Sequence, residues 1–134
     1  MSVAARQRIL FGVALLLVAA DLVQKASAPV YGHPRGLGYV LVAALLTAVL
    51  VRFVPRVPSR VLAAAGGVAA AGAFGNLVSA LAWRGGIPNP IVAGQIAFNI
   101  SDLCAVVGAA GLVLGALGFA LRHPELLRQP VSGL

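Results

Sequence analysis

Four long apolar stretches alternate along the chain with short segments rich in Pro, Gly and Arg. Each stretch is close to the about 20 residues that an α-helix needs to cross the hydrocarbon core of a membrane. The pattern predicts an all-α membrane protein in which residues 1–134 form a single four-helix domain. The predicted spans are about 9–25, 39–54, 61–83 and 96–121.

Helix-breaking residues separate the spans. Residues 26–38 contain two prolines and three glycines, residues 54–60 read Val-Pro-Arg-Val-Pro-Ser-Arg, and residues 84–90 read Arg-Gly-Gly-Ile-Pro-Asn-Pro. Pro and Gly at this density end a helix and favour turns. We therefore expect three short connections, of which the first and third lie on one side of the membrane.

Composition supports a membrane protein and excludes an ordinary soluble domain. Hydrophobic residues make up 60% of the chain and charged residues 10%, and the mean hydropathy is +0.99. Soluble domains carry about 25% charged residues. The net charge of +7 comes from basic residues at the ends of the apolar stretches, without interleaved aromatic residues, so it does not indicate nucleic acid binding.

The basic residues predict the orientation of the chain. Lys and Arg collect in the cytoplasmic segments of membrane proteins. Seven basic residues fall on one side of the predicted spans and three on the other, which predicts that both termini are cytoplasmic and that the loops at 26–38 and 84–90 are external. The seven are Arg6, Arg8, Arg52, Arg56, Arg60, Arg122 and Arg128, and the three are Lys25, Arg35 and Arg84.

Polar residues inside the spans are the candidate site. A charged side chain at the centre of a membrane costs about 3 kcal/mol on insertion scales, so it persists where it faces protein, water or an opposite charge. Asp21 and Lys25 stand in the favourable i, i+4 order for an ion pair. Asn99 and Asp102, three residues apart, would share one helical face, and Asn76 lies at the same depth in the third span. A structural role for these side chains remains the alternative.

Glycines of the last span form a stripe. Gly108, Gly111, Gly115 and Gly118 recur at spacings of three and four residues, roughly opposite Asp102 on a helix. Small residues let membrane helices approach closely. The stripe predicts a partner interface with a larger membrane complex, or else packing within the bundle.

The sequence indicates neither metal nor cofactor. Cys104 is the single cysteine, so no internal disulfide can form, and His33 has no second His, Cys or carboxylate at ligand spacing. Membrane lipid is the partner that the composition itself implies.

Two segments of the chain resemble segments of a known family. Residues 72–78 read Gly-Ala-Phe-Gly-Asn-Leu-Val, and residues 98–102 read Phe-Asn-Ile-Ser-Asp. They resemble the Gly-Ala-x-Gly-Asn-Leu-Ile and Phe-Asn-x-Ala-Asp segments of signal peptidase II, the lipoprotein signal peptidase of bacterial inner membranes. Residues 21–25 are similar to its Asp-Gln-x-x-Lys motif with the Gln displaced, and residues 33–38 to its His-Asn-x-Gly-Ala-Ala loop with the Asn lost. The resemblance implies a multi-pass protein of the bacterial inner membrane.

The resemblance also implies a departure from the family's chemistry. Its members are aspartyl peptidases that activate one water between two carboxylates, and Asp102 occupies the position of the second. At the first position stands Pro88 or, after a one-residue shift of the alignment, Asn89. The family's Asp-Arg pair is Ser79-Ala80 here. The first external loop is shorter than the family's, so the comparison implies short external loops with a reduced β-structured cradle.

From these departures we expect a pseudoenzyme. Its function would be to bind a lipid or lipoprotein, or to serve as an accessory subunit of a larger membrane complex. The alternative is an active aspartyl lipoprotein signal peptidase with an altered dyad, in which Asp21 would replace the missing carboxylate.

Overall fold

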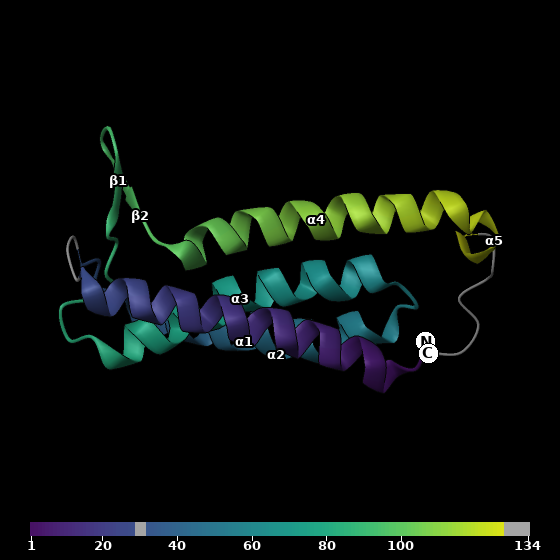
Figure 1. The fold of residues 1–134 in the computed structure, drawn as a ribbon, viewed down its shortest axis with the longest axis horizontal. Coiled ribbons are helices and arrows are strands. Elements are labelled where there is room, and N and C mark those ends of the chain that lie inside the picture. Colours follow the sequence, from purple (N-terminus) through teal and green to yellow (C-terminus); the bar gives the residue numbers. More distant parts are fainter. Residues whose placement is uncertain (29–31, 128–134) are drawn as a thin grey trace.

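Four long helices build the molecule, and all four are long and apolar enough to cross a membrane, as predicted. The structure, a computed structural model, describes residues 1–28 and 32–127. The long helices run side by side along the long axis of the molecule (Figure 1). They are α1 (Val3–Ser27), α2 (Leu37–Phe53), α3 (Arg60–Ala82) and α4 (Ile100–Arg122), joined by a 3-10 turn, η1 (Val54–Arg56), and followed by the short α5 (Pro124–Leu127).

Helix α3 is the centre of the bundle. Within the most apolar part of each helix, 61% of α3 is buried, against 22% of α1 and 11% each of α2 and α4. Its sequence is dense in Ala and Gly, which lets neighbouring helices approach from several sides. Helices α1, α2 and α4 accordingly pack on α3 and leave their outer faces for lipid.

Glycines set the distances between α3 and its neighbours. A Cβ at Gly72 would lie 2.7 Å from the Cα of Ala105 in α4, and a Cβ at Gly67 would lie 2.6 Å from the carbonyl oxygen of Leu10 in α1. Real Cβ atoms do not approach other atoms so closely. Any larger residue at these positions would therefore push the helices apart.

The end of the bundle remote from the N-terminus carries a β-hairpin. Strands β1 (Ile91–Ala93) and β2 (Ile96–Phe98) pair antiparallel, with Ile91 opposite Phe98 and Gly94 in the turn at a φ of 62°. The hairpin projects sideways beyond α4 (Figure 1). The fold is thus mostly helical with one small sheet.

The hairpin corrects the predicted start of the last span. Residues 96–98, predicted as its first turn, form β2, and helix α4 starts at Ile100. The physical reason is Asn99, whose extended backbone and side-chain oxygen cap the helix at this point.

Two connections meet beside the hairpin. His33 and Ile87 exchange backbone hydrogen bonds of 3.0 Å in each direction, which ties the α1–α2 connection to the α3–β1 connection. Gly86 next to this bridge has a φ of 97°, a conformation that favours glycine. Residues 29–31 of the predicted first loop lie outside the described residues.

The opposite end gathers the starts of α1 and α3, the turn η1 and helix α5 (Figure 1). Arg6 is buried there and donates from Nε to the carbonyl oxygen of Pro55 at 2.6 Å. The basic residues predicted to share one side of the membrane lie at this end, except Arg128, which lies outside the described residues.

Candidate functional site

A buried ion pair lies at the hairpin end of the bundle. The ammonium of Lys25 donates to Asp21 Oδ2 at 2.7 Å, to Asn76 Oδ1 at 2.9 Å and to Ser79 Oγ at 2.9 Å. Asp21 and Lys25 are both fully buried. Each of the three ammonium protons has an acceptor, which is the condition under which a buried charge is tolerated.

The second oxygen of Asp21 binds the start of α4. The backbone N–H of Ser101 donates to Asp21 Oδ1 at 2.9 Å, and the N–H of Ile100 donates to Gln24 Oε1 at 3.4 Å. The first N–H groups of a helix lack partners within it and favour negative charge. Helix α1 thus positions the N-terminus of α4 through the side chains of Asp21 and Gln24, which accept hydrogen bonds from its first two N–H groups.

Asp102 is held on both carboxylate oxygens. Its Oδ1 accepts from Asn76 Nδ2 at 2.8 Å, and its Oδ2 accepts from the backbone N–H of Asn99 at 3.2 Å. In return, Asn99 Oδ1 accepts from the backbone N–H of Asp102 at 2.9 Å, completing a capping box. The expectation that Asn99 lies within the helix is therefore wrong, because Asn99 is the N-cap, but the capping box does bring Asn99 and Asp102 together.

Asn89 extends the network into the loop before the hairpin. Asn99 Nδ2 donates to Asn89 Oδ1 at 2.7 Å and to the carbonyl oxygen of Pro88 at 3.3 Å. Asn89 Nδ2 donates to the carbonyl oxygen of Ala97 at 3.3 Å and lies 3.0 Å from His33 Nδ1. Two residues were predicted at the position of the missing carboxylate. Asn89 joins the network through its side chain, and Pro88 joins it through its backbone carbonyl alone.

These contacts connect all the polar residues selected from the sequence into one hydrogen-bonded network, which we call the polar network. Its members are Asp21, Lys25, Asn76, Ser79, Asn89, Asn99 and Asp102. Two residues of this region were not predicted from the sequence. Gln24 accepts from a backbone N–H through its side chain, and Ser101 donates its backbone N–H to Asp21. Residues 1–28 and 32–127 hold no group of three His, Cys, Asp or Glu side chains suited to a metal ion.

An apolar groove leads to the polar network. It has a volume of about 290 Å³ and runs over α3 between α2 and α4, with Leu46 on one wall and Ala109 on the other. Tyr39, Asn76 and Asp102 line its polar end, and Asp102 is only partly buried. We call this space the α2–α4 groove.

The glycine stripe of α4 packs largely within the molecule. Gly108 lies against the backbone of Ala69, and Cβ atoms at Gly111 and Gly115 would come within 3.1 Å of Ala65 and 2.9 Å of Leu62 in α3. Gly118 has open space around it. Packing within the bundle thus explains three of the four glycines, and the stripe no longer favours an interface with a larger complex.

Comparisons with known proteins give no match: no family model, no curated protein and no solved structure resembles the chain closely enough to place it. The class of protein that the structure defines is therefore a helical membrane protein with a buried polar network at one end.

The cap of α4 gives the first testable prediction. Asn99→Ala removes an N-cap and leaves the amide of Asn89 without its buried partner, so we expect a loss of about 2 kcal/mol in the free energy of unfolding in detergent. Ser2→Ala, which removes the exposed cap of α1, is the matched control and should cost clearly less. Equal losses in the two variants would contradict the role given to Asn99.

Proposed function

We propose that the chain is a divergent, catalytically inactive relative of signal peptidase II in the bacterial inner membrane, which binds an acylated ligand, a lipid or lipoprotein, in the α2–α4 groove. The observation that carries this proposal is the α2–α4 groove, which is apolar along its walls and has Asp102 and Asn76 at its polar end.

Hydrolysis by an aspartyl dyad needs two carboxylates that share one water and exchange protons with it. At the first dyad position the resemblance places Pro88, which has no side-chain acceptor, or Asn89, whose Oδ1 and Nδ2 both make hydrogen bonds. An amide does not take up a proton near neutral pH, so it cannot act as the base. Asp102 is therefore left without the partner that the reaction requires.

Asp21 is the remaining carboxylate at this end, and its environment argues against a catalytic role. It is fully buried, and its two oxygens bind Lys25 Nζ and the N–H of Ser101. Releasing either oxygen would leave a buried ammonium or the start of α4 without its partner. We infer that Asp21 holds the fold together.

The groove suits a ligand with an apolar chain and a polar end. Its walls are Leu, Val and Ala side chains, which exclude water and match an acyl chain. At its end, the partly exposed carboxylate of Asp102 can accept a hydrogen bond from an N–H or O–H group of the ligand. An acylated cysteine at the start of a peptide combines both features.

The orientation forms part of the same proposal. The arginine-rich end with α5 would face the cytoplasm, because basic residues are retained there. The hairpin and the polar end of the groove would then lie at the outer leaflet, where a lipoprotein precursor presents its lipidated residue.

Binding can be tested separately from cleavage. The purified chain in lipid nanodiscs should bind a fluorescent dipalmitoyl lipopeptide, and Ala109→Leu, which narrows the groove, should weaken this binding about tenfold or more, as steric exclusion predicts. Ala110→Leu on the exposed side of α4 is the matched control and should bind like the wild type. Unchanged binding by Ala109→Leu would refute the groove as the site.

The active peptidase with an altered dyad is the second candidate. The observation in its favour is that Asp102 stays partly exposed at the groove while Asp21 lies in the same polar network. It predicts that the wild type cleaves a lipidated precursor and that Asp102→Asn does not.

A further inference from the structure

Contact between helices α3 and α4 ends toward the end that carries α5. Gly108 lies against the backbone of α3, and Cβ atoms at Gly111 and Gly115 would come within 3.1 Å of Ala65 and 2.9 Å of Leu62, whereas a Cβ at Gly118 would meet nothing within 4 Å. The partner residues run along α3 from Ala69 to Leu62, close to its start at Arg60. Beyond Gly115 a gap therefore opens beside α4 at the α5 end, and we call this gap the V.

A cavity lies in this V. Its volume is about 510 Å³, and its walls are Ser59 and Val61 at the start of α3 and Leu114, Phe119 and Arg122 at the end of α4. Val61 is 67% exposed and Leu114 is 68% exposed. The apolar part of these walls, Val61, Leu114 and Phe119, favours an apolar occupant in a membrane, because water gains no hydrogen bonds from it.

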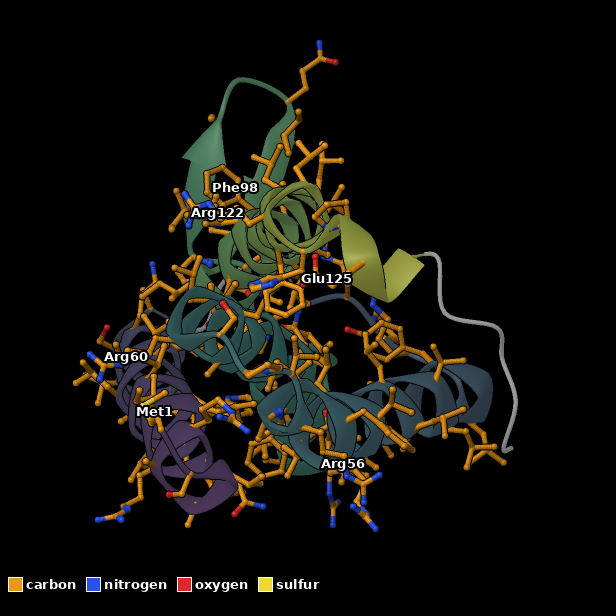
Figure 2. The ribbon with its side chains drawn as sticks, turned by 90° about the vertical axis from the view of Figure 1, so that its right-hand side faces the viewer. Met1, Arg56, Arg60, Phe98, Arg122 and Glu125 are labelled. Atoms are coloured by element: carbon orange, nitrogen blue, oxygen red, sulfur yellow. The ribbon has the colours of Figure 1, made fainter. Side chains whose placement is uncertain are left out.

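Positive charge lies at one wall of the V. Arg122 lines the cavity, and Arg60 follows Ser59, which also lines it. Figure 2 looks onto this end and labels Arg122 and Arg60, with Arg56 of η1 farther from Arg122. The acid at this end is Glu125, whose pKa lies below its ordinary value because its carboxylate accepts a backbone N–H bond and faces His123. Its Oε1 lies 3.1 Å from His123 Nδ1, and within the described part of the chain no carboxylate lies at salt-bridge distance from Arg122.

We propose that this V is a binding site for one anionic phospholipid. An acyl chain would lie in the gap over Gly118, between Val61 and Leu114, and the phosphate would lie at Arg122 at the level of the head groups. Basic pockets between membrane helices bind phosphate head groups, and each basic residue near the head groups contributes about 1 kcal/mol. The proposal is independent of the α2–α4 groove, which shares no lining residue with this cavity and has its polar end at the opposite end of the bundle.

The test is native mass spectrometry of the full chain in mild detergent, titrated with dioleoyl phosphatidylglycerol or with dioleoyl phosphatidylcholine. We expect one phosphatidylglycerol to bind several times more tightly than phosphatidylcholine. Arg122→Gln should weaken phosphatidylglycerol binding about fivefold, as the loss of one basic contact predicts. Arg8→Gln, an exposed arginine of α1 away from the V, is the matched control and should bind like the wild type.

A second variant tests the proposed position of the acyl chain. Gly118→Leu fills open space, so the protein should fold normally but lose the bound lipid, whereas Gly12→Leu, also in open space but on α1, should retain it. Inorganic phosphate at the same concentration should not displace the lipid, because it lacks the chain. Equal binding of both lipids, displacement by phosphate, or lipid binding unchanged by Gly118→Leu would each overturn the proposal. So would release of a co-purified protein by Gly118→Leu with lipid binding intact, because the V would then hold a partner helix.

Discussion

Lys25→Met is expected to destabilise the protein by about 3–5 kcal/mol, the cost of breaking a buried ion pair from one side. The substitution keeps the length of the side chain but leaves the Asp21 carboxylate buried without its cation, and it removes the donor to Asn76 and Ser79. The free energy of unfolding can be measured by titration with sodium dodecyl sulfate in mixed micelles.

Two further variants separate charge from packing. Arg8→Met removes an exposed positive charge and should leave stability within about 0.5 kcal/mol of the wild type. Lys25→Met combined with Asp21→Asn removes both charges and should recover part of the loss. If Lys25→Met alone unfolds at the wild-type denaturant fraction, the ion pair does not hold α1 and α3 together.

Gly108→Leu is expected to disrupt the packing of α4 on α3, with a loss of about 3 kcal/mol or more from overpacking. Its effect should be large because the obstacle is the backbone of Ala69, which no rotamer change can move aside. Unfolding in the same mixed micelles, together with thermal aggregation of the purified protein, measures the loss.

Gly118→Leu is the matched control for this prediction. It also replaces a glycine of α4 with leucine, but at a position where the new side chain enters open space. The structure predicts stability close to that of the wild type. Similar losses at Gly108 and Gly118 would mean that contact between α3 and α4 extends to Gly118.

Hydropathy was sufficient to predict the four helices, because a span must be apolar over its whole length. The start of α4 was not predictable in the same way. Residues 96–98 are as apolar as the helix that follows, and a short apolar run does not distinguish strand from helix. The cap at Asn99 decides the boundary, and a pattern search that places Asn99 inside the helix misses it.

The grouping of the polar residues at one end was predictable because charged and amide side chains in a membrane must find partners. Their pairing was not, apart from Asp21 with Lys25, which lie one turn apart. Lys25 also binds Asn76 and Ser79, which are 51 and 54 residues away, and this contact depends on how α1 packs on α3. The hydrogen bonds from backbone N–H groups of α4 to Asp21 and Gln24 could not be predicted from the sequence, because their donors are not side chains.

The most direct test of the proposed function is a cleavage assay with a diacylglyceryl-modified prolipoprotein in reconstituted vesicles, read by gel shift. The wild type, Asp102→Asn and a catalytically active signal peptidase II as positive control are compared at equal protein amounts. We predict that the wild type and Asp102→Asn both leave the precursor intact while the positive control cleaves it. Cleavage by the wild type that is lost in Asp102→Asn would contradict the account and establish a working peptidase.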